Sequence, residues 1–525
     1  MTAGVPAYPL TLARAIGAAT TRAPGKRALL CEGRELSYGG LTQRIRRVGH
    51  AARGGWSINR GDRVALMMPN GLEYIEIVAG LSELGAVVVT LGAYLSATEL
   101  AAQMADSQAS ALIVHGSLAE MAHDASGLPP HRILVLGPAY EDWLSRASDA
   151  ALASEVAEVD SFAMSYTSGT TGRPKGVLIS HRSRALTFAA MAVEYGCYGP
   201  DDRALTVAPM FHGAGFAFAA APLVFGGSVE IMTRFEPEPV LRRLAEGAAT
   251  NLFVVPTHLY GLFALPPAVL GAHRSDALKT LICNAAPLPT ALKERALAHF
   301  GPGRLFECYG STEGGIISNL RPADQARKQQ CVGQPFPWTE IRLLDDAGRE
   351  VAPGQTGEIH TRSPFFFNGY WRQPEATAEA LREGWLTVGD LGCFDDEGHL
   401  YIVGRKKDMI LTGGINVYPR EVEDLLATHP LVAEACVVGL PDAQWGERVV
   451  AGLVLRDPTA ESQNGAGGLI EALTALARTH LAQPKRPKQY VVIDQVPRNA
   501  SGKVLKRVLQ EQLIQSPALP DAKET

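Results

Sequence analysis

In the first part of the chain, stretches whose apolar positions follow a strand pattern alternate with stretches whose apolar positions follow a helix pattern. Residues 72–84 carry apolar side chains at helical spacing. Short apolar runs, typical of buried strands, stand at 63–68, 86–90 and 111–114, and again around Val207, 254–255 and 281–282. Because strand–helix–strand alternation is typical of parallel sheets covered by helices, we expect an α/β fold with layered, mainly parallel sheets.

The pattern changes twice further along the chain. From Val332 to Leu400 it becomes short strands separated by Gly/Asp turns at 345–348 and 395–398, which predicts a small β-rich subdomain. After Gly404-Arg405 it predicts an α+β module of ordinary domain size, with a tail that frays after Gln515. The elements of this module are expected at 420–429, 469–481 and from 504 for helices, and at 435–439, 449–455 and 490–493 for strands. We therefore expect a large N-terminal domain over 1–405 and a small C-terminal domain over 406–525.

The amino-acid composition argues against several classes of function. The 525 residues are 46% hydrophobic and 20% charged, with a net charge of −5, so neither a nucleic-acid footprint nor a polybasic membrane anchor is present. The most apolar stretch, 215–229, is broken by Pro222 and Gly226, which favours a buried core element over a membrane span. Seven dispersed cysteines without CxxC spacing, and a start without signal-peptide character, predict a cytoplasmic protein with reduced thiols and no integral membrane association.

The strongest local signal is the segment Tyr166–Gly176, YTSGTTGRPKG, which lies between two apolar strands. Its glycines allow backbone N–H groups to approach an anion closely, its hydroxyls can donate to phosphate oxygens, and its lysine adds a positive charge. An ordinary Gly/Ser/Thr turn does not require so many donors together with a lysine. The Walker A pattern is absent, which argues against a P-loop kinase or GTPase. The candidate phosphate-binding residues are Thr167, Ser168, Gly169, Thr170, Thr171, Gly172 and Lys175.

This segment resembles the signature loop of the superfamily that contains acyl-CoA synthetases, peptide-synthetase adenylation domains and beetle luciferases. Similar matches follow in order along the chain: PMFH (209–212), YGSTE (309–313), GE (357–358), WLTVGD (385–390), GRKKD (404–408), GG (413–414) and PRNASGK (497–503). One departure is TLGAY at 90–94, which replaces a more usual Pro-Leu-Asn-Pro-Arg type of sequence. The resemblance implies ATP-dependent activation of a carboxylic acid as an acyl-adenylate, followed by transfer to CoA.

For adenylation, the resemblance implies a role for each motif. The loop would hold the β- and γ-phosphates, Glu313 and the weaker candidate Thr170 would ligate Mg²⁺, and Thr312 would contact the α-phosphate. Asp390 and Arg405 would bind the ribose, and Lys503 would stabilise charge on the two anionic reactants. The small-residue run and the YGST motif would border the nucleotide and the acyl chain: Asn284, Ala285, Ala286, Tyr309, Gly310 and Ser311. Read without the resemblance, Glu313 is a solvated turn carboxylate, Asp390 a turn cap and Lys503 a surface lysine.

For the second half-reaction, the resemblance implies that the C-terminal domain rotates about a hinge near Lys407. Gly413 and Gly414 would then leave a slot for the pantetheine arm of CoA, and the same pair also fits a plain hairpin turn. His212 would gate the carboxylate end of the site, although a histidine in an apolar segment is more often a packed core residue.

The resemblance implies that the acyl pocket is formed near 211–218, 255–258 and 284–288, and these segments constrain the acid. No Lys or Arg occurs between Pro209 and Val229, whereas a second substrate carboxylate would require a paired cation. We therefore expect an apolar monocarboxylic acid of the fatty, alicyclic, aryl or steroid side-chain type, and not a malonate-like dicarboxylate. Three alternatives remain: delivery to a carrier-protein thiol, a luciferase-like oxygenase, and a nucleotide-binding protein without turnover. The last would be expected to lose Glu313, Asp390 or Lys503, and all three are present.

Overall fold

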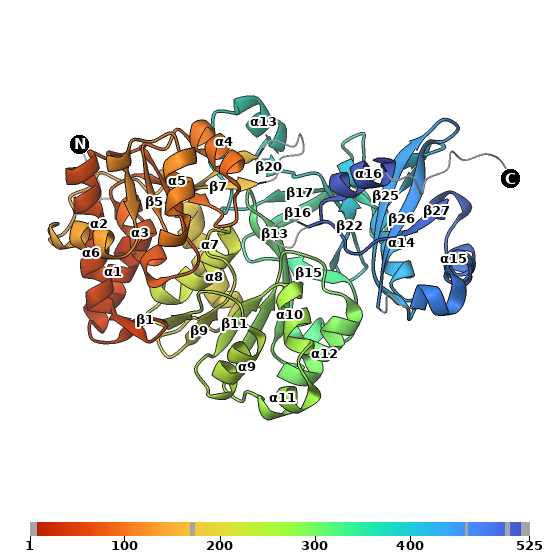
Figure 1. The fold of residues 1–525 in the computed structure, drawn as a ribbon, viewed down its shortest axis with the longest axis horizontal. Coiled ribbons are helices and arrows are strands. Elements are labelled where there is room, and N and C mark those ends of the chain that lie inside the picture. The colour runs from red at the N-terminus through yellow and green to blue at the C-terminus, as the bar shows by residue number, and fades with distance from the viewer. Residues whose placement is uncertain (1–7, 168–173, 457–459, 499–503, 516–525) are drawn as a thin grey trace. The chain divides into compact units, whose positions relative to one another are not determined.

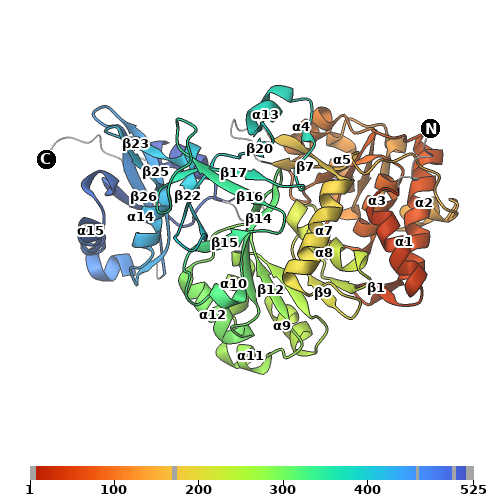
Figure 2. The same ribbon diagram turned by 180° about the vertical axis from the view of Figure 1, so that it is seen from behind.

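The computed structural model describes residues 8–167, 174–456, 460–498 and 504–515, without the side chains of 460–467 (Figures 1 and 2). The chain divides into two compact units. The first is Met1–Ile341 with Thr361–Val388, and the second is Arg342–His360 with Gly389–Thr525. The expected β-rich subdomain, 332–400, is therefore divided: residues 342–360 and 389–400 belong to the second unit and the remainder to the first. The domain boundary at 405/406 and the hinge at Lys407 stay predictions.

One sheet of the first unit follows the strand order β18-β8-β7-β4-β3-β5-β6. Strands β3 to β7 run parallel, and β8 and β18 are added antiparallel, in agreement with the alternation of the sequence. Its strands are β3 Arg63–Met67, β4 Val87–Leu91, β5 Ala111–Val114, β6 Ile133–Val135, β7 Ser161–Thr167, β8 Lys175–Ser180 and β18 Gly369–Tyr370.

The second sheet of this unit follows the order β15-β14-β13-β12-β11-β9-β10-β1-β2. The strands from β13 to β1 are parallel, so the carboxyl ends of β9, β11, β12 and β13 meet at one edge. The strands are β1 Arg27–Cys31, β2 Arg34–Ser37, β9 Arg203–Thr206, β10 Ser228–Ile231, β11 Asn251–Val254, β12 Thr280–Cys283, β13 Leu305–Ser311, β14 Gly315–Leu320 and β15 Cys331–Pro335. Two short strands, β19 Leu381–Arg382 and β20 Trp385–Leu386, form a further pair in this unit.

Two helices connect the sheets of the first unit. α7 packs on β8, α8 packs on β9 and β10, and the two helices contact each other (Figure 2). The apolar stretch 215–229 is thus a buried core element, as predicted. The helices of this unit are α1 Leu12–Arg22, α2 Tyr38–Trp56, α3 Leu72–Glu83, α4 Ala97–Ser107, α5 Ala119–Ala125, α6 Pro138–Ser145, α7 His181–Tyr195, α8 Gly213–Val224, α9 Pro237–Ala245, α10 Pro256–Phe263, α11 Pro267–Ala272, α12 Thr290–Phe300 and α13 Pro374–Ala380.

The second unit is built from the short strands and turns that the sequence predicts. β16 Glu340–Leu344, β17 Gly357–Arg362, β21 Asp390–Phe394 and β22 Leu400–Arg405 are joined by tight turns, in which Gly348 and Gly398 donate to the carbonyls of Asp345 and Asp395. A further sheet has the order β24-β23-β26-β25, with β27 beside β26. Its elements are β23 Ile410–Thr412, β24 Ile415–Val417, α14 Pro419–Leu426, β25 Val432–Asp442, β26 Gly446–Leu455, α15 Ala460–His480, β27 Gln489–Val492 and α16 Lys506–Gln515.

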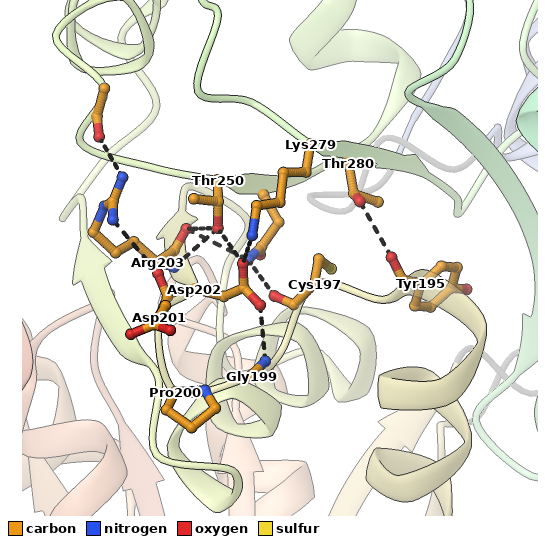
Figure 3. Close-up of polar contacts among 12 residues, drawn as sticks. Tyr195, Cys197, Gly199, Pro200, Asp201, Asp202, Arg203, Thr250, Lys279 and Thr280 are labelled. Carbon is orange, nitrogen blue, oxygen red and sulfur yellow. Dashed lines mark hydrogen bonds and ion pairs between the residues drawn. The ribbon is translucent and has the colours of Figure 1, made fainter. Parts of the chain in front are cut away.

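A polar network ties together the amino ends of β9, β11 and β12 (Figure 3). Asp202, Thr250 and Lys279 each stand directly before one of these strands. The Asp202 carboxylate accepts hydrogen bonds from the Gly199 N–H at 2.8 Å, the Thr250 hydroxyl at 3.1 Å and the Lys279 ammonium at 2.7 Å. The Thr250 hydroxyl in turn accepts from the backbone N–H of Arg203 at 2.9 Å. One carboxylate and one hydroxyl therefore link the amino ends of three neighbouring strands.

The cysteines and the longest apolar helices bear on two expectations drawn from composition. All seven cysteines lie in the described ranges, and none is bonded to another. Within those ranges, every helix is too short or too polar to cross a membrane. The cytoplasmic location stays a prediction.

Candidate active site

The predicted phosphate loop connects two antiparallel strands of the first unit. Thr167 at the end of β7 pairs with Lys175 at the start of β8, so these two residues fix the ends of the loop. The Lys175 ammonium lies 4.7 Å from the centre of the Tyr370 ring, which reaches it from the neighbouring strand β18. The predicted residues Ser168, Gly169, Thr170, Thr171 and Gly172 lie outside the described residues.

Glu313 follows β13 and is only 8% exposed. Its Oε1 accepts a hydrogen bond from the Tyr370 hydroxyl at 2.9 Å, and burial together with this carboxylate raises the pKa of Tyr370. Within the described ranges no cation is paired with Glu313. Tyr370 therefore stands between the predicted metal ligand Glu313 and the predicted phosphate-binding Lys175, and sequence reasoning missed it. In the sequence, Tyr370 lies between Gly369 and Trp371, far from the motifs that contain Lys175 and Glu313, so its role could not be predicted from a local pattern.

A tight hairpin between β13 and β14 presents Glu313. The Ser311 hydroxyl accepts from the Gly314 N–H at 2.9 Å, and a Cβ on Gly310 would stand 2.1 Å from the Gly315 carbonyl oxygen. Gly310 is thus required by close backbone approach. Tyr309, Gly310 and Ser311 end β13, and Thr312 and Glu313 form the tip, so the structure brings together the residues of the YGSTE motif.

The small-residue run 284–286 leaves β12 at the same edge of the sheet as the end of β13. Ala285 has φ = +77°, a left-handed conformation that alanine rarely adopts. The backbone N–H of Ala285 donates a hydrogen bond to the Asn284 side-chain oxygen. Ala285 and Ala286 are exposed, whereas Leu288 is buried. The loop therefore has small, exposed residues beside the strand ends, and its role as a border of the nucleotide and acyl sites stays a prediction.

His212 stands at the start of α8, after the carboxyl end of β9. Its Nε2 is buried without a hydrogen-bond partner in the described part of the chain, and burial lowers its pKa to about 4. His258, after β11, stacks on Phe235, and burial lowers its pKa to about 4 as well. Both rings are therefore neutral near pH 7. The gating role of His212 stays a prediction, and its burial also fits a packed core residue.

In the second unit, the predicted ribose pair is formed. Asp390 and Arg405 face each other across β21 and β22, with Arg405 Nε 2.8 Å from Asp390 Oδ1. Asp390 is buried at 4% exposure, so its charge is balanced by this arginine. Neighbouring Lys406 is paired with Asp346 and Glu358, which raises its pKa, whereas Lys407 is exposed.

The glycine pair 413–414 forms the turn between β23 and β24, with φ of +56° and +78°. A Cβ on Gly413 would stand 2.7 Å from the Trp445 ring, and the Gly413 N–H donates to the Trp445 carbonyl at 2.8 Å. The hairpin-turn interpretation is thus confirmed, and the slot stays a prediction. Lys503 lies outside the described residues.

The arrangement of acidic side chains bears on which metal ion the site could hold. Within the described ranges, no group of three or more His, Cys, Asp or Glu side chains gathers to hold an ion. Mg²⁺ is usually bound by one or two carboxylates together with substrate phosphates, so a single buried carboxylate such as Glu313 fits it better than a dedicated cage would.

Two family models match this chain. A family model described as AMP-binding enzyme matches residues 17–371, and one described as AMP-binding enzyme C-terminal domain matches 421–503. A feruloyl-CoA synthase from Amycolatopsis sp is 38% identical over 480 residues, 90% of this chain and 93% of that protein. The fatty acid–[acyl-carrier-protein] ligase ScoC from Streptomyces coeruleorubidus is 34% identical over 93% of both chains.

Among solved structures, the o-succinylbenzoate CoA synthetase MenE from Bacillus subtilis, in complex with the acyl-adenylate intermediate OSB-AMP, is 28% identical. It superposes with a TM-score of 0.84 over 97% of this chain and 98% of that chain. The predicted α/β fold, with a large N-terminal and a smaller C-terminal part, is confirmed. The chain therefore belongs to the AMP-binding enzyme family, as an acid–thiol ligase of the AMP-forming kind.

Proposed function

We propose that this protein is an ATP-dependent carboxylic acid–CoA ligase. A carboxylate oxygen of the acid attacks the α-phosphorus of ATP and pyrophosphate leaves; the CoA thiol then attacks the acyl carbon and AMP leaves. The observation that carries the proposal is the row Lys175–Tyr370–Glu313, in which a buried carboxylate that forms no ion pair within the described residues lies beside the end of the phosphate-type loop. Such a carboxylate is costly unless a cation neutralises it, and Mg²⁺ would do so while also screening the phosphates.

The other residues of the first half-reaction are assigned by their motifs. Thr167, Lys175 and the loop between them bind the β- and γ-phosphates, and Thr312 contacts the α-phosphate. Asp390 accepts hydrogen bonds from the ribose hydroxyls while Arg405 holds its carboxylate, which the 2.8 Å ion pair supports. The loop 284–286 and residues 309–311 border the nucleotide and the acid. Lys503 stabilises the charge that develops on the two anionic reactants.

The second half-reaction requires a rearrangement, because thiol attack needs access to the adenylate after pyrophosphate leaves. We assign the hinge to Lys407, the boundary to 405/406 and the pantetheine slot to Gly413-Gly414. The exposure of Lys407 and the left-handed turn at the two glycines support these assignments.

The acid is assigned an apolar body with one reactive carboxylate, of the fatty, alicyclic, aryl or steroid type. Apolar and small residues at 211–218 support this assignment, as do the relatives named for feruloyl and fatty acyl groups. The carrier-protein ligase among the relatives keeps a second acceptor open, namely a phosphopantetheine thiol on a carrier protein.

The test is acid-dependent pyrophosphate exchange over a library of apolar acids, followed by addition of either CoA or a phosphopantetheinylated carrier protein. Exchange with apolar acids and release of AMP with CoA would support the proposal. Exchange that is followed by transfer only to the carrier protein would assign the second acceptor. The absence of exchange with every acid, in folded protein, would overturn the proposal.

Two variants divide the half-reactions. Lys503→Ala should lower exchange by about 10²–10³-fold and spare thioester formation from supplied acyl-AMP. Lys407→Pro should have the opposite effect, because proline fixes φ near −65° and blocks the rotation. Equal loss of both activities in either variant would contradict the assignment of that residue.

A further inference from the structure

Tyr370 contacts two charged side chains that come from different motifs of the candidate site. Its hydroxyl donates to Glu313 Oε1 at 2.9 Å, and its ring centre lies 4.7 Å from Lys175 Nζ. Within the described residues, neither Glu313 nor Lys175 forms an ion pair, with the other or with a third group. One neutral side chain therefore holds an anion with its hydroxyl and a cation with its ring, and the two opposite charges stay separate.

The backbone around Tyr370 is fixed by both neighbouring elements. Tyr370 pairs with Val177 of β8, the strand that begins at Lys175, and its N–H donates to Thr377 Oγ1 at 2.9 Å. The N–H of Phe367 donates to the backbone carbonyl of Glu313 at 2.8 Å. Because the same short segment is bonded to β8 and to the Glu313 hairpin, Tyr370 is placed rigidly enough to orient both charged groups.

A second buried carboxylate shows how this fold satisfies a charge that serves stability alone. Glu76 is fully buried and accepts from the Tyr140 hydroxyl at 2.7 Å, as Glu313 accepts from Tyr370. Glu76 also accepts from Arg44 Nε at 2.6 Å and Nη2 at 2.8 Å, so an arginine balances its charge. At Glu313 the tyrosine is present and the cation is not, in the part of the chain that the structure describes. The Glu313 site is therefore completed by a cation that the described residues do not supply.

We infer that Tyr370 is a positioning residue of the adenylation site, whose hydroxyl orients the Glu313 carboxylate for Mg²⁺ and whose ring holds the Lys175 ammonium for the ATP phosphates. This inference rests on the proposed function and deepens it. Because a hydroxyl is a neutral donor, it fixes Oε1 without competing for the charge of the carboxylate. Oε2 makes no hydrogen bond within the described residues and is left for the metal.

The two contacts of Tyr370 have separable consequences. Donors that orient a metal-ligating carboxylate typically change metal affinity by about 10- to 100-fold when they are removed. A cation on an aromatic face gains a weaker attraction and keeps its full charge. Without the ring, Lys175 and Glu313 would be free to neutralise each other before ATP binds. Loss of the hydroxyl should therefore affect Mg²⁺, and loss of the ring should affect the phosphates as well.

The experiment measures melting temperature with α,β-methylene ATP, whose bridge between the α- and β-phosphorus is not cleaved. The analogue is added at fixed concentration, either in EDTA or over a series of free Mg²⁺ concentrations. Four proteins are compared: the wild type, Tyr370→Phe, Tyr370→Leu and the matched control Tyr140→Phe. The control removes the same hydroxyl from a buried carboxylate that an arginine already balances.

We expect Tyr370→Phe to need about 10- to 100-fold more free Mg²⁺ for half of the melting shift, and to show the wild-type shift in EDTA. Tyr370→Leu should show the higher Mg²⁺ requirement and also bind the analogue about 3- to 10-fold more weakly in EDTA. Tyr140→Phe should keep the wild-type Mg²⁺ requirement. Without nucleotide, both phenylalanine variants should melt below the wild type, because each removes a donor from a buried carboxylate.

A double-variant cycle tests whether the hydroxyl acts through Glu313. In the Glu313→Gln background, Tyr370→Phe should change the Mg²⁺ requirement by no more than about twofold, because the carboxylate that the hydroxyl orients is gone. Pyrophosphate exchange measured in parallel should show the same division. The apparent KM for Mg²⁺ should rise in Tyr370→Phe, and the apparent KM for ATP should rise in Tyr370→Leu.

An unchanged Mg²⁺ requirement in folded Tyr370→Phe would overturn the inference. Losses of equal size with Mg²⁺ and in EDTA, or an equal rise of the Mg²⁺ requirement in Tyr140→Phe, would also overturn it, because they would show a structural role only. If the expected melting shifts occur while the wild type exchanges pyrophosphate with no acid, the proposed chemistry fails and Tyr370 stays assigned. If the analogue leaves wild-type melting unchanged with and without Mg²⁺, both proposals fail.

Discussion

The two edges of the β9–β13 sheet have opposite chemical character. At the amino edge, Asp202 accepts three hydrogen bonds, and Thr250 and Lys279 complete the network of Figure 3. At the carboxyl edge, Glu313 has one neutral donor, Ala285 is left-handed and His212 Nε2 has no described partner. Ligands of open α/β sheets bind at the carboxyl ends of the strands. The amino edge therefore stabilises the fold, and we propose that the carboxyl edge binds the substrates.

Two cations express the same difference. Lys279 is 56% exposed and yet paired with Asp202, whereas Arg184 is half-buried and forms no ion pair within the described ranges. Substitutions at the two edges should accordingly separate stability from activity.

The largest effect is expected at the carboxyl edge, for Glu313→Gln. Removing the negative charge weakens the metal and phosphate site, so adenylation should fall by about 10²–10³-fold. Stability should be unchanged or higher, because a poorly matched buried charge is gone. Pyrophosphate exchange and urea unfolding measure the two quantities, with exposed Glu294→Gln on α12 as control. A loss of stability equal to that of an Asp202 variant would show that Glu313 is structural.

The next effect is expected at the amino edge, for Asp202→Ala. Gly199 N–H, the Thr250 hydroxyl and Lys279 lose their acceptor, so unfolding of the first unit should become easier by about 2–4 kcal/mol. Exchange activity below the melting transition should stay within about twofold of the wild type. Exposed Asp201→Ala is the matched control. A selective loss of activity in Asp202→Ala would remove the distinction between the edges.

The sequence predicted the fold and the motifs better than the contacts between distant residues. The YGSTE hairpin and the Asp390–Arg405 pair follow from local motifs of the sequence, whereas the phosphate loop stays a prediction because residues 168–173 lie outside the described residues. Tyr370 was missed because only the pairing of β18 with β8 brings it to Lys175. The Asp202 network could not be predicted from a sequence motif, because Asp202, Thr250 and Lys279 lie far apart along the chain, each directly before a different strand.

The stability of the protein should depend on pH through His258, which lies at the carboxyl edge. Burial lowers the pKa of His258 to about 4, against about 6.5 in an unfolded chain, so the neutral ring's stabilising contribution is complete above pH 6.5 and is lost as pH falls towards 4. His258→Gln should therefore lose about 1 kcal/mol less stability than the wild type between pH 7.5 and 5.5. Urea unfolding at both pH values measures this, with exposed His123→Gln as control. Equal losses in the wild type and His258→Gln would contradict the neutral, buried ring.

The smallest effect is expected for Lys279→Met, at the amino edge. Although the Lys279–Asp202 pair is short, more than half of the lysine side chain is in water, and exposed pairs contribute about 1 kcal/mol or less. Asp202 keeps Gly199 N–H and the Thr250 hydroxyl, so its carboxylate is not left unmatched. Urea unfolding of Lys279→Met, Asp202→Ala and the double variant gives the coupling between the two residues. We expect a small coupling that shrinks further in high salt, since screening weakens an exposed pair. A loss as large as that of Asp202→Ala would mean that the ion pair, rather than the hydrogen bonds from the backbone and Thr250, holds this edge together.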